Sequence, residues 1–270
     1  MKKMYYILFL VIITIILITI LIITDNTKEK KEKVTSIDTS YVFYKKNYYE
    51  RYINYKEKFN FDDKKTILNV NIGLDKPFYT NPIKSTNLNS NTVLVNKYNY
   101  LPSDYVPKNL VIIDKYSKGG IKLDKEAYDN FVLMAQEAER NNLKIRIVSG
   151  YRSYDYQKGL YNNYLKYDTQ EKVDTYSARP GFSEHQTGLA IDIDNGLFRY
   201  DEFHLTKEFT WVKNNAYKYG FILRYGLNQE NITGYKYEPW HYRFVGREIS
   251  EYIYKNDLTY EEYYYEFLDK

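Results

Sequence analysis

The segment that decides the fold runs from Ser183 to Asp192 and reads SEHQTGLAID. In a β-strand successive side chains point to opposite faces, so alternating apolar positions indicate a strand with one buried face. Asp192 would project from the face opposite the apolar residues. His185 precedes the strand, and Gly188 gives the chain the freedom to turn His185 back towards Asp192. The apolar positions of this strand are Leu189, Ile191 and Ile193.

A second unusual segment, EPWH at residues 238–241, contains another of the only three histidines in the chain. Two imidazoles and one carboxylate give zinc three protein ligands and leave one coordination position open, as catalytic zinc requires. The chain has no cysteine, which excludes Cys-ligated zinc, thiol catalysis and disulfides. We therefore predict that His185, Asp192 and His241 hold one zinc ion. His204 lacks such a context and is expected to be an ordinary surface or core residue.

Glu238 lies three residues before His241, and in a regular strand these two side chains would face opposite ways. Pro239 removes a backbone donor and favours a local bend that brings both groups to one cavity. A carboxylate near the metal can accept a proton from water and deliver it to a leaving amine. We predict that Glu238 is the catalytic acid and base.

Five further residues are considered for the same site. Arg152 stands between a predicted strand and a predicted helix, and its guanidinium suits either a carboxylate or the oxyanion that forms on a scissile carbonyl. Gln157 and Ser183 can each hydrogen-bond a peptide, although Gln157 could equally be an exposed helix residue. Trp240 is expected to form a wall of the pocket. Asp194 is either a residue that orients a metal ligand or a surface carboxylate.

The surrounding pattern predicts an α+β domain with a small antiparallel sheet flanked by helices. Asp124 can cap a helix with apolar residues at helical spacing, which Asn141 and Asn142 can end. Further helices are expected from about Tyr154 and from about Thr206, the latter with Gly220 as its stop. The predicted strands are Leu143 to Ser149, Phe221 to Arg224 and Tyr237 to Phe244, besides the one described above.

Several motifs together resemble the VanY-type D-alanyl-D-alanine carboxypeptidases, from about Asn91 to Gly246. They are LVNK at 94–97, LPSDYVP at 101–107, SGYRS at 149–153, SEHQTGLAID at 183–192, YGFILRY at 219–225, TG at 233–234 and EPWHYR at 238–243. One departure is Gly226-Leu-Asn after Tyr225, where family members often have a Pro-rich turn. This affects a loop and leaves the motifs intact.

The resemblance implies the hedgehog/D-Ala-D-Ala peptidase fold, a zinc cofactor, and peptidoglycan stem peptides ending in D-Ala-D-Ala as substrate. It implies that His185, Asp192 and His241 are the zinc ligands and that Glu238 is the base. It also favours stabilisation of the transition state by Arg152 and substrate binding by Ser183. Two alternatives remain open: a D,D-dipeptidase or cell-wall endopeptidase on the same scaffold, and a non-catalytic wall-binding module.

The N-terminus carries an uncharged, Ile- and Leu-rich run from Met4 to Thr24, which is long enough to span a bilayer as a helix. We predict an uncleaved transmembrane anchor at 1–24, an extracytoplasmic spacer at 25–90 that carries a short helix, and a catalytic domain at 91–270. The lysine count on the two sides of the run would place the domain inside, but the implied substrate lies outside the cell. A net charge of +4 from 39 basic and 35 acidic residues gives no indication of nucleic-acid binding.

Overall fold

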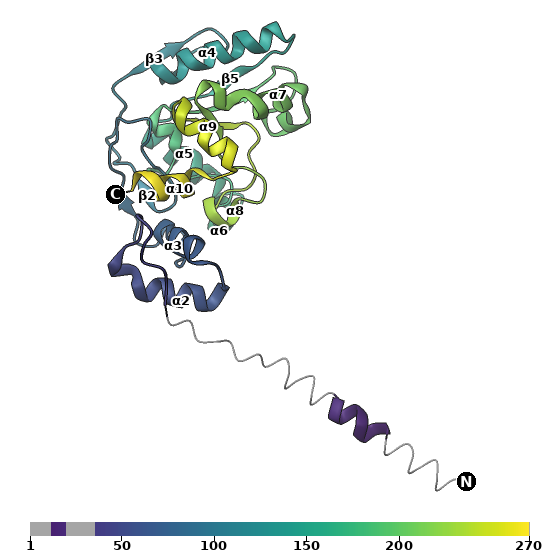
Figure 1. Cartoon of the computed structure of the whole chain (residues 1–270). Helices are drawn as coiled ribbons and strands as arrows, with labels where there is room; N and C mark the ends of the chain where they lie inside the picture. Colours follow the sequence, from purple (N-terminus) through teal and green to yellow (C-terminus); the bar gives the residue numbers. More distant parts are fainter. Residues whose placement is uncertain (1–11, 20–35, 270) are drawn as a thin grey trace, which may run out of the picture.

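The computed structural model describes residues 12–19 and 36–269 of the 270-residue chain (Figure 1). Residues 12–19 are helical, and a helix of this length extends about 12 Å. The hydrocarbon core of a bilayer is about 30 Å thick. Within the described ranges no helix is long and apolar enough to cross a membrane. On this finding, the prediction of a single-pass membrane protein is wrong. Residues 4–11 and 20–24 of the predicted span lie outside the described residues.

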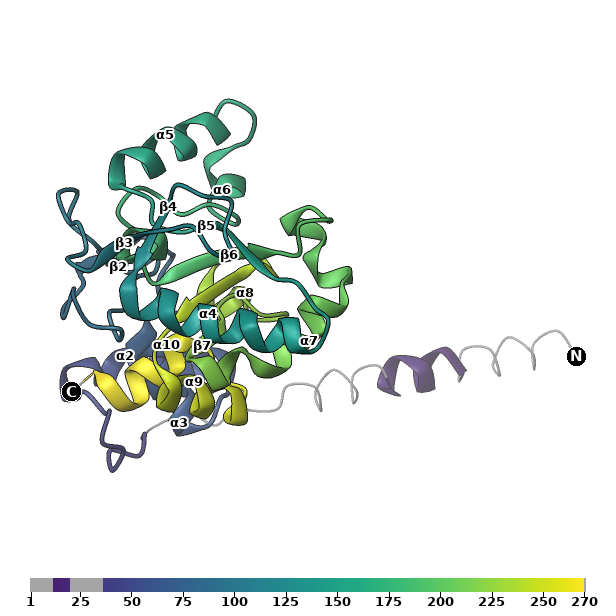
Figure 2. The ribbon, with the colours of Figure 1, turned by 90° about the horizontal axis from the view of Figure 1, so that it is seen from above.

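The domain is built on a four-stranded antiparallel sheet, which confirms the predicted α+β class (Figures 1 and 2). Across the sheet its strands are β5 (Arg146–Ser149), β6 (Ala190–Asp194), β8 (His241–Phe244) and β7 (Phe221–Leu223). Two smaller sheets pair β1 (Ile83–Lys84) with β2 (Asn99–Tyr100), and β3 (Leu110–Ile113) with β4 (Ile121–Asp124).

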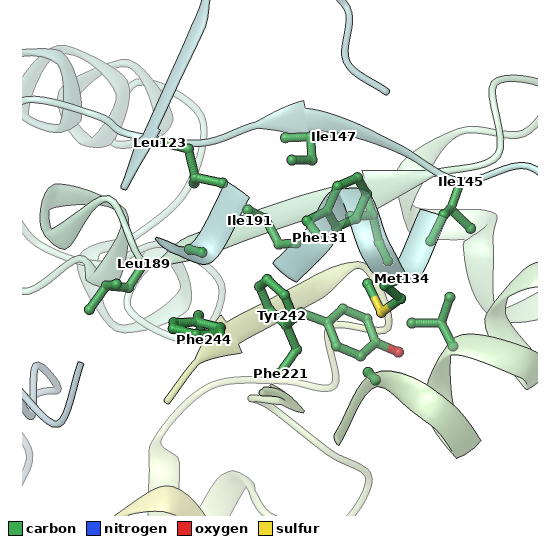
Figure 3. Close-up of a cluster of buried hydrophobic side chains, with 14 of the residues drawn as sticks. Leu123, Phe131, Met134, Ile145, Ile147, Leu189, Ile191, Phe221, Tyr242 and Phe244 are labelled. Carbon is green, nitrogen blue, oxygen red and sulfur yellow. The ribbon is translucent and has the colours of Figure 1, made fainter. Parts of the chain in front are cut away.

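The two middle strands of the sheet have one apolar and one polar face. Ile191 of β6 lies opposite Tyr242 of β8, and both belong to the main hydrophobic core (Figure 3). Asp192 follows Ile191 and His241 precedes Tyr242, so both point to the other face of the sheet, where they lie opposite each other. The apolar face therefore anchors the sheet, and the polar face presents the functional groups. The core on the apolar face includes α4 through Ala127, Phe131, Met134, Ala135 and Ala138.

Three predicted helices are confirmed, and each begins at a side-chain cap. They are α4 (Lys125–Arg140) after Asp124, α5 (Tyr154–Tyr164) after Ser153, and α7 (Lys207–Asn215) after Thr206. A short turn, η4 (Ala216–Tyr219), continues α7 and ends at Gly220, whose φ is +84°. A Cβ at Gly220 would lie 2.5 Å from Phe244, so both the conformation and the space require glycine. The remaining short helices of this part are α6 (Gln170–Val173), η2 (Glu184–Thr187), η3 (Tyr200–Leu205) and α8 (Glu230–Thr233).

Two strands begin later than predicted, and the reason in each case is a backbone hydrogen bond. Leu143 donates its amide to Ala138 and closes the end of α4, so β5 begins only at Arg146. The amide of His241 donates to the carbonyl of Glu238 and closes a turn over Pro239, so β8 begins only at His241. Pro239 thus has the bending effect that the sequence predicted.

A second hydrophobic cluster joins the N-terminal helices to the C-terminal ones. The segment predicted as a spacer carries η1 (Lys46–Tyr48), α2 (Tyr49–Phe59) and α3 (Asp63–Ile72), which share this cluster with α9 (Arg247–Asn256), α10 (Tyr260–Tyr263) and the helical turn η5 (Tyr264–Leu268). Its buried members include Tyr52, Ile67, Val70, Ile253 and Tyr260. Figure 1 shows α3 between α2 and α10. Helices α2 and α3 therefore share a hydrophobic core with the end of the chain.

Candidate active site

Strand pairing brings two of the three predicted ligands, Asp192 and His241, together. Asp192 on β6 and His241 on β8 are directly opposite each other, so their side chains leave the sheet on the same face. The Oδ1 atom of Asp192 lies 3.2 Å from Nδ1 of His241. Both residues are buried. Antiparallel register therefore joins two residues that are distant in sequence.

His185 is delivered to the same point by the turn η2. This turn ends at Gly188, whose positive φ of 71° returns the chain to β6. The Nδ1 atom of His185 lies 2.7 Å from the carbonyl oxygen of Gly150, and its Nε2 atom lies 3.4 Å from Oδ1 of Asp192. An Nδ1–H that donates to this carbonyl leaves the lone pair of Nε2 directed at Asp192.

One ligand atom from each of His185, Asp192 and His241 falls within 4.8 Å of the others. The two imidazole rings are 5.0 Å apart at an interplanar angle of 85°. Oδ1 of Asp192 lies between them and has no hydrogen-bond partner among the residues described. A buried carboxylate oxygen without a partner is unfavourable unless a cation or donor completes its surroundings. The three side chains therefore fit a metal ion.

The charges around this cluster act on the two histidines in opposite directions. Burial and the nearby guanidinium of Arg152 lower the pKa of His185 to about 4, which keeps this imidazole neutral. Burial also opposes the charged form of His241, but the carboxylates of Asp192 and Glu184 outweigh it and raise the pKa of His241 to about 9. The metal-free cluster thus draws a proton to the ring that faces the carboxylates. A bound cation would take the place of that positive charge.

Glu238 reaches the cluster from the turn before β8. Its Oε2 atom lies 3.6 Å from Nδ1 of His241, and its side chain is buried. Burial raises the pKa of Glu238 to about 7, with His241 and Arg152 opposing this rise and Asp192 adding to it. A carboxylate with a pKa near neutral pH can both accept and return a proton.

Arg152 is held by the candidate metal ligand itself. Its Nη2 donates to Oδ2 of Asp192 at 2.5 Å, and its Nε donates to Oγ of Ser149 at 3.1 Å. The pairing of β5 with β6 is irregular between Ile147 and Ser149, which places Ser149 opposite Asp192. Arg152 therefore lies beside the cluster, and it is paired with Asp192.

Apart from Asp194, the residues considered for the site line one cavity of about 380 Å³. Gln157 is 2% exposed and donates from Nε2 to the carbonyl of Ala178, so it is not an exposed helix residue. Its Oε1 atom has no hydrogen-bond partner in the described part of the chain. Ser183 is buried in the cavity wall, and Trp240 lines it. An unpaired amide oxygen in a cavity wall is suited to receive an N–H from a ligand.

Two other residues considered from the sequence lie elsewhere. Asp194 forms an ion pair with Arg146 at 2.7 Å and accepts the amide of Gly196, so its bonds serve the end of β6. His204 is exposed on η3, where its Nδ1 atom lies 3.1 Å from the carbonyl oxygen of Asp201. His204 is therefore separate from the cluster.

Sequence reasoning missed Glu184 and Tyr225. Glu184 is completely buried, and its Oε2 atom lies 3.6 Å from Nε2 of His241. The ring of Tyr225 lies against the ring of His241, with 4.9 Å between centroids. Glu184 is part of the SEHQTGLAID segment, so its place beside His185 was a signal that could have been used. Tyr225 could not be singled out by residue type, because the chain contains 34 tyrosines.

Comparison with known proteins identifies the family. The family profile of VanY, D-alanyl-D-alanine carboxypeptidase, matches residues 120–247. The bifunctional D-Ala-D-Ala dipeptidase and D-Ala-D-Ala carboxypeptidase VanXYC of Enterococcus gallinarum is 34% identical over 180 residues, which are 63% of this chain and 92% of that protein. The chain belongs to the VanY family of D-alanyl-D-alanine carboxypeptidases.

Other relatives match a similar share of the chain. YodJ of Bacillus subtilis strain 168 is 46% identical over 181 residues, or 63% of this chain. The matches span 54% to 66% of the length of three of the curated relatives. The solved structure of the LdcB LD-carboxypeptidase is 42% identical with a TM-score of 0.64, covering 68% of this chain and 89% of LdcB. A VanY D,D-pentapeptidase solved in complex with Zn(II) is 32% identical with a TM-score of 0.54, covering 64% of this chain and 98% of that chain.

Proposed function

We propose that the chain is a zinc-dependent carboxypeptidase that removes the terminal D-Ala from peptidoglycan stem peptides or precursors ending in D-Ala-D-Ala. The observation that carries the proposal is the unpartnered Oδ1 of Asp192 between two imidazoles, with Glu238 buried beside it in the same cavity. A binding module has no need of a carboxylate with a near-neutral pKa beside an incomplete metal site.

Zinc is the metal that this ligand set favours. His185, Asp192 and His241 offer two nitrogens and one oxygen, and three protein ligands leave a position open for chemistry. The related VanY enzyme solved with Zn(II) supports the same choice. When bound, zinc would supply a Lewis acid that polarises the scissile carbonyl. We assign the catalytic domain to residues 91–270 and expect it to bind one zinc ion per chain.

The chain's own residues then divide the work. Glu238, buried 3.6 Å from His241, takes a proton from the attacking water and returns it to the amine of the departing D-Ala. Arg152 lies at the cavity beside Asp192 and stabilises the negative charge that develops on the carbonyl oxygen. Ser183 and Gln157 bind the peptide through hydrogen bonds, and Trp240 forms a wall of the pocket.

A second candidate differs in the configuration of the residue before the scissile bond. The LdcB structure, at 42% identity, is that of an LD-carboxypeptidase, and VanXYC combines dipeptidase and carboxypeptidase activities. A terminal D-Ala that follows an L-residue presents the same leaving group with a different neighbour. The same cluster could therefore act on stem tetrapeptides or release a dipeptide.

Mass spectrometry of two stem peptides separates these activities. The zinc-loaded protein would be incubated with a pentapeptide ending in D-Ala-D-Ala and with a tetrapeptide ending in an L-residue followed by D-Ala. Loss of one D-Ala from the pentapeptide supports the proposal, and loss from the tetrapeptide alone supports the second candidate. Loss of the D-Ala-D-Ala dipeptide would make the chain a dipeptidase. A catalytic role would be contradicted if neither peptide gave a product, either with the protein as purified or after treatment with a chelator and reloading with zinc.

A further inference from the structure

A buried carboxylate that the proposed mechanism does not use lies directly beside the candidate metal site. Glu184 is the first residue of η2 and immediately precedes His185. Its side chain is 0% exposed, and its Oε2 atom lies 3.6 Å from Nε2 of His241. Neither of these two atoms has a hydrogen-bond partner among the described residues. Glu184 is therefore next to His185 in the sequence and faces His241 in space.

The orientation of the His241 ring directs its second nitrogen at Glu184. Nδ1 of His241 faces Asp192 at 3.2 Å, so Nε2 points away from the cluster towards Glu184. A metal-binding histidine usually donates its other ring N–H to a carboxylate or a carbonyl, which fixes the tautomer and the ring. His185 already has such a partner in the carbonyl of Gly150, at 2.7 Å. Glu184 occupies the equivalent place for His241.

The other oxygen of Glu184 is held from two sides. Oε1 accepts from Nε of Arg224 at 2.9 Å and from Nη1 of Arg243 at 3.0 Å. Arg224 also donates from both terminal nitrogens to the carboxylate of Glu261, at 2.8 and 2.6 Å. All four side chains are at most 1% exposed, and their two positive and two negative charges balance. The carboxylate that faces His241 is thus fixed by a neutral, buried network.

Glu261 extends this network beyond the family-matched region. It lies on α10, whereas the VanY profile matches residues 120–247. Asn96, which precedes β2, donates to the same carboxylate at 3.2 Å. The C-terminal helix is therefore connected to the candidate metal site through Glu261, Arg224 and Glu184.

The geometry points to Glu184 as the positioning residue of His241: it accepts the Nε2–H of the metal-bound ring and keeps Nδ1 directed at the metal, while Glu261 holds Glu184 in place through Arg224. This inference rests on the metal site of the proposed function. Loss of the Glu184 charge leaves the ring free to rotate and removes the acceptor that favours the Nε2–H tautomer. Loss of the Glu261 charge leaves Arg224 with Glu184 as its one remaining carboxylate partner in this network.

Zinc affinity is the first measurement, made on the full chain by competition with a chromophoric chelator. Glu184→Gln should weaken zinc binding by about 10- to 100-fold, the usual effect of removing such a partner. Glu184→Asp, which keeps the buried charge but withdraws the carboxylate, and Glu261→Gln should each cause a smaller loss in the same direction. Glu251→Gln is the matched control, because Glu251 is half exposed on α9, where it forms an ion pair with Lys255. It should bind zinc as the parent does.

The second measurement is the exchange of imidazole N–H protons in the zinc-loaded protein, observed by NMR after ¹⁵N-labelling of histidine. The chain has only three histidines, and the exposed His204 provides a rapidly exchanging internal reference. In the parent, His241 should show a slowly exchanging Nε2–H. In Glu184→Gln this signal should exchange faster, while the Nδ1–H of His185, bound to Gly150, stays unchanged.

The outcomes separate this inference from the proposed function. A parent protein that binds no zinc contradicts the metal site and the inference with it. A parent that binds zinc, together with folded Glu184→Gln and Glu184→Asp variants of parental affinity, overturns the inference alone. Should the variants not fold, the unmodified zinc-loaded protein decides: a protected Nε2–H on His241 supports the role of Glu184, and a freely exchanging one overturns it.

Discussion

Two buried polar clusters share one face of the central sheet and differ in how completely their atoms are paired. His241 and Arg243 are two residues apart on β8, so their side chains leave the same face of the sheet. Around Arg243, all three guanidinium nitrogens donate to oxygen atoms, as do those of its neighbour Arg224. Around His241, Oδ1 of Asp192 has no partner in the described structure. Glu184 contacts both clusters.

The difference separates structural support from a binding site. Buried charges are tolerated when they are paired and hydrogen-bonded, and the arginine cluster satisfies this condition without help from a ligand. In the histidine cluster, Oδ1 of Asp192 has no such bond in the described structure, and a bound cation would complete its surroundings. Incomplete pairing next to complete pairing, in equally buried surroundings, therefore marks the place where the protein binds something.

The largest effect should follow from removing a ligand of the incomplete cluster. His241→Ala leaves two protein ligands, which seldom retain zinc at working concentrations, so both the metal and the activity should be lost. His204→Ala is the control, since this exposed histidine lies outside the cluster. Elemental analysis of the two purified variants measures the effect. Stoichiometric zinc in His241→Ala would remove this residue from the site.

The next effect concerns the chemical step. Glu238→Gln keeps the shape of the side chain and removes the proton acceptor, so turnover should fall by at least about 100-fold. Zinc content and peptide affinity should change little, because the loss falls on the reaction and not on ground-state binding. All three quantities would be measured on one preparation. Near-parental turnover would exclude Glu238 as base, and loss of zinc would make it a ligand.

Breaking the complete cluster should affect stability. Arg224→Met leaves the buried carboxylate of Glu261 without its two strongest donors, which should destabilise the fold by about 3 to 5 kcal/mol. Urea unfolding of the metal-free protein measures this loss without a contribution from zinc. Arg247→Met removes an exposed arginine from the start of α9 and should stay within about 0.5 kcal/mol of the parent. Equal stability of the two variants would mean that the network contributes no more than a surface charge.

The smallest effect concerns a buried charge outside both clusters. Lys97 lies among the rings of Phe78, Tyr79 and Tyr235, and burial lowers its pKa to about 8 from 10.5. Between these two pH values the unfolded chain binds a proton that the folded chain does not. Folding therefore becomes more favourable as pH rises through this window, by at most about 3 kcal/mol at about 1.4 kcal/mol per pKa unit.

Unfolding of the parent and of Lys97→Met at a series of pH values isolates this contribution. The stability of the parent relative to the variant should be constant below pH 8 and should rise from pH 8 towards 10.5. A difference that stays flat across this window would show that Lys97 is not a destabilising buried charge.

Local signals in the sequence were enough for several elements. Asp124 and the spacing of Ala127, Phe131 and Met134 predicted α4, because capping and helical periodicity depend on neighbours along the chain. Hydropathy gave the wrong result at the N-terminus, where the helix described at residues 12–19 is too short to span a bilayer. Helix α2 looked weakly periodic because the tyrosines Tyr52 and Tyr55 form its buried face.

The residues of the candidate site could be named from the sequence, since two of three histidines and two carboxylates stand in two short motifs. Their arrangement could not. The register that sets Asp192 opposite His241 and the pairing of Arg152 with Asp192 join segments far apart in the chain. Likewise, only the folded chain connects Glu184 through Arg224 to Glu261. Periodicity specifies which face of an element is buried, whereas the partner across that face depends on how distant segments pack.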